Sequence, residues 1–398
     1  MVTLALSKEQ EISCVQAVIL AREAELGGRP PTALIALAAR LEAQPALSAW
    51  LIDRSRPSAL PSALADRFIH APMPPSSDYS GPPNSLVEVL ARAGLDCPER
   101  LDAGVHAWLD IFSLLNPALL VCQQAPVVAL AARLVGLPVI HFGPAWSIGL
   151  EPQAIRPWSD SPRQYDGALA AMLASVNTVL ARNRQTAMKQ LDELYAPADR
   201  VLLQGWPELD PYPRATRPRY TGAWPDAPTA LAHRKSVQKT RILAVLENRA
   251  YLRKVLAWLV EEACECCLDL PVSAAETARH FTSASMTLRT DTPGQADELN
   301  ADLVICHGQH EAVLEALSAG RPLLILPQWP LEQRMASQLE ALGLAMVLHG
   351  APEPSALRAA LAAVLADQAM QQRALRWAQQ RSSDLADPVV SVLKLCRQ

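Results

Sequence analysis

The stretch Cys306–Pro327, CHGQHEAVLEALSAGRPLLILP, does most to limit the folds open to this chain. An apolar run ends in a turn at Gly308, and a helical pattern follows. Gly320 stands where that helix should end, and Pro322 opens the next apolar run. The order is strand, tight turn, helix and strand. Such a unit requires two parallel strands of one sheet, with the helix packed on a face of that sheet.

The same alternation extends over most of the chain. Strands are expected in the first half at 2–7, 48–54, 67–73, 117–123, 138–143 and 199–205, with helices at 10–28, 31–44, 85–95, 99–115, 126–136 and 167–195. In the second half, strands are expected at 241–247, 301–308 and 321–327, with weaker candidates at 268–274, 279–284 and 286–290. Helices are expected there at 250–267, 311–320, 332–343 and 353–382. Repeated strand–helix alternation predicts an α/β protein with parallel sheets.

A segment rich in Pro and Arg, 207–228, separates the two alternating halves. A chain of 398 residues is also too long for one ordinary core. We therefore expect a first Rossmann-like domain at 1–215, a linker at 216–237 and a second Rossmann-like domain at 238–398. A cleft is expected at the carboxyl ends of both sheets.

Composition excludes several classes of function. The net charge is −4, and the short basic cluster of Arg234, Lys235, Lys239 and Arg241 is interpreted as a solvated linker, so no nucleic-acid partner is expected. The first residues have no basic segment followed by a long apolar one, and 116–142 is interrupted by polar residues and Pro. We expect no membrane span and a cytoplasmic location.

Eight cysteines in such a chain are expected to be reduced packing residues. The sequence CECC, Cys264–Cys267, is interpreted as a packed helix end, because no second Cys pair or His at ligand spacing completes a metal site. No metal and no cofactor are expected.

The turn at 306–310 has the geometry of an anion site. A helix that begins near His310 directs its free N–H groups and the positive end of its dipole toward the cleft. His307, at the end of the strand, is placed to donate a hydrogen bond to a phosphate. The alternative from spacing alone is a turn that binds no ligand.

Residues 301–343 resemble the GT-B glycosyltransferases that use nucleotide sugars and small acceptors, the UDP-glycosyltransferase-like class. That family carries D-L-x-x-x-H-G-G-x-G-T-x-x-E-A-L-x-x-G-x-P-x-x-x-x-P, followed by an acidic residue and Gln. The matching residues in this chain are His307, Gly308, Glu315, Ala316, Leu317, Gly320, Pro322, Pro327, Glu332 and Gln333.

The resemblance implies a GT-B fold and a role for each matching residue. His307 would contact the donor diphosphate, and Gly308 would let the backbone approach it. Glu315 would bind the ribose hydroxyls, and Glu332 and Gln333 those of the sugar. The acceptor would lie against the first domain. The sugar would be transferred by direct displacement with inversion, the nucleotide-diphosphate sugar serving as co-substrate.

The chain departs from the family motif where the phosphate should lie. Gln309 and Glu311 stand in place of two glycines, and Ala312 stands in place of a threonine. The first change adds bulk, the second adds repulsive charge, and the third removes a donor. One extra residue also stands between Pro327 and Glu332, before the pair Glu332–Gln333. Gln309 and His310 are nonetheless candidate donor contacts, with a structural role as the alternative for His310.

The first domain departs further. The family has a Gly-rich turn and a catalytic His after its first strand, whereas this chain has no His before His70. Glu9 and Glu11 are the candidate substitutes, although a carboxylate is a weaker base at neutral pH. His141, at the end of an expected strand, is a third candidate base, with a structural role as its alternative. Gln123–Gln124 replace the Asp and His that tend to follow the fourth strand.

Two functions therefore remain open. The first is a glycosyltransferase that moves a sugar to a small or lipid-like acceptor. The second is a catalytically degenerate homologue, a pseudoenzyme that binds a nucleotide or a protein partner, such as an active homologue. An epimerase of the same fold is less favoured, because its several acids and bases cannot be placed. The donor and acceptor are not determined by the sequence.

Overall fold

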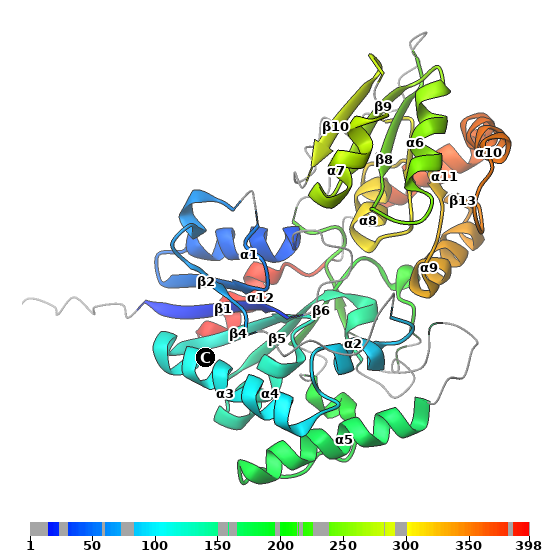
Figure 1. Cartoon of the computed structure of the whole chain (residues 1–398). Helices are drawn as coiled ribbons and strands as arrows, with labels where there is room; N and C mark the ends of the chain where they lie inside the picture. The colour runs from blue at the N-terminus through cyan, green and yellow to red at the C-terminus, as the bar shows by residue number, and fades with distance from the viewer. Residues whose placement is uncertain are drawn as a thin grey trace, which may run out of the picture.

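The computed structural model describes residues 15–23, 31–57, 60–72, 83–149, 158, 165–195, 200–212, 214, 218–225, 239–281, 283–290, 301–380 and 385–397. Within them the chain forms two α/β lobes, each built on one sheet (Figure 1). Named strands pair only in parallel in both sheets. The two-lobed α/β architecture predicted from the alternating pattern is confirmed.

The first sheet has the strand order β3-β2-β1-β4-β5-β6-β7. Its strands are β1 (Gln16–Arg22), β2 (Leu47–Asp53), β3 (Phe68–His70), β4 (Pro117–Gln123), β5 (Val139–Pro144), β6 (Val201–Gln204) and β7 (Arg219–Tyr220). The order reverses between β1 and β4, and this reversal is where doubly wound sheets open a crevice at their carboxyl edge.

Helices cover both faces of the first sheet. The helices of the lobe are α1 (Thr32–Glu42), α2 (Leu86–Arg92), α3 (Pro98–Leu115), α4 (Pro126–Val135) and α5 (Tyr165–Arg182), with 3-10 turns at Ser62–Leu64, Ala145–Ser147, Leu191–Leu194 and Pro207–Leu209. Ile19 and Ala21 share a core with α2, α3, α4 and α5, whereas Val18 and Leu20 share one with α1. Alternate residues of β1 therefore enter cores on opposite faces.

The position of the first strand differs from the prediction. We expected a helix at 10–28, yet 16–22 is strand β1; the strand expected at 2–7 lies outside the described residues. The apolar run Val18–Ala21 is buried on both faces of the sheet, and such a run cannot be told from a buried helix by periodicity alone. The segment after the first strand is consequently the one that contains Gly27–Gly28, not 8–14.

The second sheet has the order β10-β9-β8-β11-β12-β13 and reverses between β8 and β11. Its strands are β8 (Arg241–Val245), β9 (Glu265–Leu270), β10 (Met286–Thr290), β11 (Leu303–Cys306), β12 (Leu323–Ile325) and β13 (Ala345–Val347). The helices are α6 (Leu252–Glu261), α7 (Val272–Arg279), α8 (His310–Ser318), α9 (Pro330–Ala341), α10 (Pro354–Ala366) and α11 (Gln368–Gln380). One core joins the sheet to α8, α9 and α11, and the other joins it to α6, α7 and α10.

The cysteine cluster was assigned to the wrong element. Cys266 and Cys267 lie on strand β9, not at the end of a helix. Because strand side chains alternate, Cys266 enters the core with α6 and Cys267 the core with α8. Residues 279–284, a weak strand candidate, instead contain the end of α7 and a turn.

The last helix, α12 (Pro388–Cys396), returns to the first lobe (Figure 1). It packs against α1 and β4, and Val392 is fully buried in the core that contains Val18 and Leu20. The sequence placed all of 238–398 in the second domain, so this helix departs from that division. Across the described parts of the chain, none of the helices combines the length and apolar character that a bilayer crossing requires.

Candidate functional site

The turn between β11 and α8 lies at the reversal of strand order in the second sheet. His307 is 1% exposed, and its Nδ1 lies 3.0 Å from the carbonyl oxygen of Leu326. Gly308 has φ 94°, and a Cβ there would lie 3.3 Å from the carbonyl oxygen of Glu332. A larger residue would be strained and crowded at this point. The turn therefore lies directly against the start of α9.

The side chain of Gln309 spans the carboxyl edge of this sheet. Its Oε1 accepts a hydrogen bond from the backbone N–H of His307 at 2.8 Å, and its Nε2 donates to the carbonyl of Val245 at 3.4 Å. The amide thus joins the ends of β11 and β8. Although Gln309 is the N-cap residue of α8, its side chain does not cap that helix. The first N–H groups of α8 keep their capacity for an anion.

A charged cluster closes the neighbouring part of the edge. Arg249, on the loop after β8, donates to Glu332 at 2.5 Å and to Glu247. Its guanidinium lies 3.5 Å from the centroid of the Trp329 ring. Burial raises the pKa of Glu332, whereas Arg249 and the backbone N–H groups of Gln328 and Trp329 lower it. Glu332 is 4% exposed and engaged in these contacts.

The other candidate donor residues of the second lobe point in different directions. His310 is buried against the first lobe: a Cβ on Gly205 would lie 3.5 Å from its Cε1. Burial lowers the pKa of His310. Glu315 is half-buried on α8, and Gln333 is exposed on α9. Among these residues, the turn at 307–309 and Glu332 are brought together.

In the first lobe, the end of β1 is occupied by charged side chains. Arg22 forms a two-pronged ion pair with Asp53, at 3.0 and 2.8 Å. Glu23 accepts hydrogen bonds from the N–H groups of Val127 and Val128, at 2.8 and 2.9 Å, which lie at the start of α4. A third comes from the indole of Trp108 at 2.5 Å. Burial raises the pKa of Glu23 to about 7, although these three hydrogen bonds lower it.

The candidate bases Glu9 and Glu11 lie outside the described residues. His141 is buried on β5, and its ring lies 5.2 Å from that of Tyr195. Burial lowers the pKa of His141 to about 4, so its imidazole is neutral at pH 7. In the part of the chain that the structure describes, its buried Nε2 has no hydrogen-bond partner.

His141 lines a small apolar pocket in the first lobe. Gln124, at φ 50°, and Ser147 contribute polar atoms to its wall. The rest of the lining is largely aliphatic and comes from α2, α4 and two loops: Leu86, Val89, Leu90, Ala125, Pro126, Ala129, Ile148 and Leu194, with Tyr195. Its volume of about 20 Å³ has room for one water molecule, far below that of a usual ligand site.

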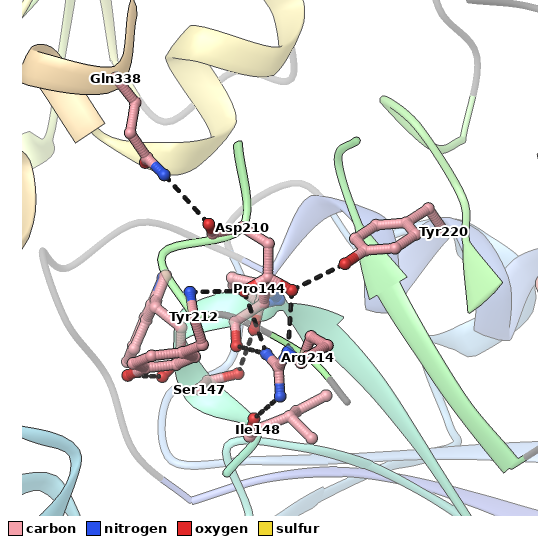
Figure 2. Close-up of polar contacts among 10 residues, drawn as sticks. Pro144, Ser147, Ile148, Asp210, Tyr212, Arg214, Tyr220 and Gln338 are labelled. Atoms are coloured by element: carbon pink, nitrogen blue, oxygen red, sulfur yellow. Dashed lines mark hydrogen bonds and ion pairs between the residues drawn. The ribbon is translucent and has the colours of Figure 1, made fainter. Parts of the chain in front are cut away.

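A polar network ties this pocket to the second lobe (Figure 2). Asp210 accepts from Arg214 and Tyr220, at 2.9 and 2.8 Å. Arg214 also donates to the carbonyls of Ile148 and Ala145, which adjoin the pocket. Gln338 of α9 donates to the Asp210 carbonyl at 3.0 Å. The segment that crosses between the lobes is thereby fixed to both.

Sequence reasoning missed Arg249, Glu23 and the Asp210–Arg214 pair. The pair had a weak local signal, because its members are four residues apart. Arg249 had none, since Glu332 lies 83 residues further along the chain. Glu23 was missed because residues 10–28 were expected to form a helix, so this residue was not recognised as following the first strand.

Comparisons with known proteins agree with this geometry. No protein-family model matches the chain. Zeaxanthin glucosyltransferase of Pseudescherichia vulneris is 28% identical over 307 residues, which cover 67% of this chain and 70% of that protein.

Solved structures resemble the whole fold. The spinosyn rhamnosyltransferase SpnG superposes with a TM-score of 0.62 at 16% identity, over 96% of this chain and 100% of its own. The glycosyltransferase SnogD from Streptomyces nogalater gives a TM-score of 0.63 at 18% identity, over 96% and 99%. The chain therefore has the GT-B fold that the motif at 301–343 predicted, and its sequence is similar to that of a glucosyltransferase.

Proposed function

We propose that this protein transfers a sugar from a nucleoside diphosphate to a hydroxyl group of a small, largely apolar acceptor. One observation carries the proposal. The turn His307–Gly308 and the uncapped start of α8 stand at the order reversal of the second sheet, where doubly wound sheets bind their ligands. A helix start with free N–H groups at that point favours a phosphorylated ligand.

The donor would bind the second lobe. Its diphosphate would lie at the start of α8, beside His307, and its ribose near Glu315, which is half-buried on the same helix. Structures of SpnG and of the glycosyltransferase SsfS6 carry thymidine diphosphate, which supports a nucleoside diphosphate here. The nucleobase and the sugar remain to be identified by binding measurements.

The acceptor would bind the first lobe at the apolar wall beside His141, where the cavity of about 20 Å³ would have to widen to admit it. Apolar walls with one neutral imidazole favour a lipid-like or polycyclic alcohol over a highly polar one. One relative is named for zeaxanthin, and SpnG has been solved with its spinosyn aglycone, which supports an acceptor of this class.

The chemistry would be a single displacement. The acceptor oxygen attacks the anomeric carbon, the bond from that carbon to the diphosphate breaks, and a base takes the acceptor proton. The Nε2 of His141 has no hydrogen-bond partner among the described residues, so we propose His141 as that base. Burial, which lowers its pKa to about 4, makes it a weak base, comparable to a free carboxylate. The start of α8 would stabilise the departing diphosphate. None of these steps requires a cofactor, and a cytoplasmic location remains a prediction.

A second function is favoured by a specific observation. Gln309 joins the ends of β8 and β11 across the very edge where a diphosphate would lie. A homologue that has lost turnover and retained nucleotide binding, or that binds an active partner protein, would tolerate such a bridge. This alternative predicts nucleotide or protein binding without transfer.

Two measurements separate these functions. A panel of nucleotides is first tested by thermal shift, since a ligand at 100 times its Kd stabilises by about 2.7 kcal/mol. The protein is then incubated with uridine- and thymidine-diphosphate sugars and a panel of apolar alcohols, and glycosides are detected by mass spectrometry. His141→Phe, which keeps the ring and removes the nitrogens, should abolish any product. Nucleotide binding with no product from any pair would support the second function.

A further inference from the structure

Arg249 has surroundings that a structural surface arginine would not need. It lies on the loop after β8, one of the two strands at the order reversal. The guanidinium stacks on Trp329 and donates to Glu332 and Glu247. Its side chain is only 8% exposed. One cation is thus enclosed by two carboxylates and an aromatic face.

The charge of this cluster matters for a phosphorylated ligand. Counted formally as two carboxylates and one guanidinium, the cluster has a charge of −1. A diphosphate at the start of α8 needs a nearby cation to offset the carboxylates. A guanidinium forms two-pronged hydrogen bonds with phosphate as readily as with carboxylate. Arg249 can therefore exchange one type of partner for the other.

Glu332 has hydrogen bonds that do not involve Arg249 and would persist during such an exchange. Its Oε1 accepts from Arg249, whereas its Oε2 accepts from the backbone N–H groups of Gln328 and Trp329, both at 3.0 Å. Loss of the arginine would leave the two backbone hydrogen bonds intact. Oε1 would then be free to accept a hydroxyl of a bound sugar.

We propose that Arg249 is the side chain that binds the diphosphate of the donor. Without ligand, its guanidinium instead contacts Glu332, Glu247 and Trp329. The phosphate replaces Glu332 as the partner of the guanidinium. The replacement uncovers Trp329 and releases Oε1 of Glu332 toward the sugar. The inference rests on the proposed function only in taking the second lobe as the nucleotide site.

The test is a calorimetric titration of the full chain with uridine diphosphate and, separately, uridine. Arg249→Met keeps the length of the side chain and removes the charge; it should lower the affinity for uridine diphosphate at least tenfold and leave that for uridine unchanged. The affinity of Arg249→Lys for uridine diphosphate should lie between those of the wild type and Arg249→Met. Lysine keeps the positive charge but cannot donate the two parallel hydrogen bonds of a guanidinium. Arg253→Met, an exposed arginine on α6, is the matched control and should bind like the wild type.

Glu332→Gln tests the exchange itself. Removing the competing carboxylate should raise the affinity for uridine diphosphate at least threefold, since this ligand has no sugar for Glu332 to bind. Tryptophan emission should change on titration of the wild type, and Trp329→Phe should remove most of that change. Arg249→Met with Glu332→Gln avoids an unpaired buried carboxylate. This double variant replaces Arg249→Met in the titration if the melting temperature of Arg249→Met is much lower than that of the wild type.

The outcomes are separable from those of the proposed function. Binding that depends on Arg249 without any sugar transfer would support this inference and contradict the transferase. Sugar transfer by Arg249→Met, with unchanged affinity for uridine diphosphate, would contradict this inference and support the transferase. Weaker binding by Glu332→Gln would overturn the proposed exchange of Glu332 for phosphate at Arg249. A wild type that binds neither uridine diphosphate nor thymidine diphosphate would also overturn it.

Discussion

The carboxyl edges of the two sheets are both occupied by side chains of the chain itself, but in different ways. In the first lobe Glu23 is completely enclosed and uses both oxygens on α4 and Trp108. In the second lobe Arg249 and Gln309 bridge the edge, while the N-cap side chain of α8, that of Gln309, does not cap this helix. The start of α4 thus binds a carboxyl group of the chain that is about half ionised at pH 7, whereas the N-cap side chain of α8 does not bind the start of that helix. Among the described residues, the comparison favours the second edge over the first as the place for a phosphate.

The largest effect is expected from removing the internal anion of the first lobe. Glu23→Ala leaves two backbone N–H groups and an indole N–H buried without acceptors, so the free energy of unfolding should fall by about 4 kcal/mol. Urea unfolding measures it. Glu99→Ala, whose side chain is 71% exposed, is the control and should change little. A loss below about 1 kcal/mol would mean that water replaces the carboxylate and that this edge is open.

The pH dependence of stability tests the same contrast. Burial raises the pKa of Glu23 to about 7 from 4.5, so the folded chain binds this proton more tightly than the unfolded chain. Its stabilising contribution is complete below pH 4.5 and is lost as the pH rises through 7. The free energy of unfolding should therefore fall by up to about 3 kcal/mol over that window. Glu23→Gln should flatten the profile in urea unfolding at pH 5 to 8, and parallel profiles would assign the dependence to other groups.

A smaller effect is expected in the second lobe from Glu315→Ala. If this carboxylate accepts hydrogen bonds from the ribose, nucleotide affinity should fall by about 1–3 kcal/mol. Calorimetry with uridine diphosphate measures it, and Glu340→Ala, exposed on α9, is the control. Unchanged affinity would show that the role implied by the family motif does not apply to this chain.

The smallest effect is expected from restoring the family motif. Gln309→Gly, Glu311→Gly and Ala312→Thr together remove the amide that bridges β8 and β11, remove a charge and add a hydroxyl. Diphosphate affinity should rise at least tenfold, about 1.4 kcal/mol. Transfer should not increase in parallel, because the triple change leaves the proposed base, His141, and its pocket in the first lobe unaltered. Tight binding by the wild type and no gain in the triple variant would make Gln309 a working donor contact.

The sequence was sufficient for the α/β class, the two lobes and the helix at 310–318, because hydrophobic runs and turn residues act locally. It was insufficient for β1, where a run buried on both faces lacks a distinguishing period. A better signal was the following Gly27–Gly28 with Pro30–Pro31, which reads as a turn before a helix. Contacts such as that of Arg249 with Glu332 depend on tertiary packing, which no local pattern contains.

The return of α12 to the first lobe bears on the order in which the chain acquires its structure during synthesis. Domains usually fold one after another as they leave the ribosome. Here Val392 is buried beside Val18 and Leu20, so the core of the first lobe stays incomplete until the whole second lobe has been translated. Until then α1 and β4 expose the apolar surface that α12 will cover. The nascent first lobe should accordingly be a better substrate for chaperones than the nascent second lobe.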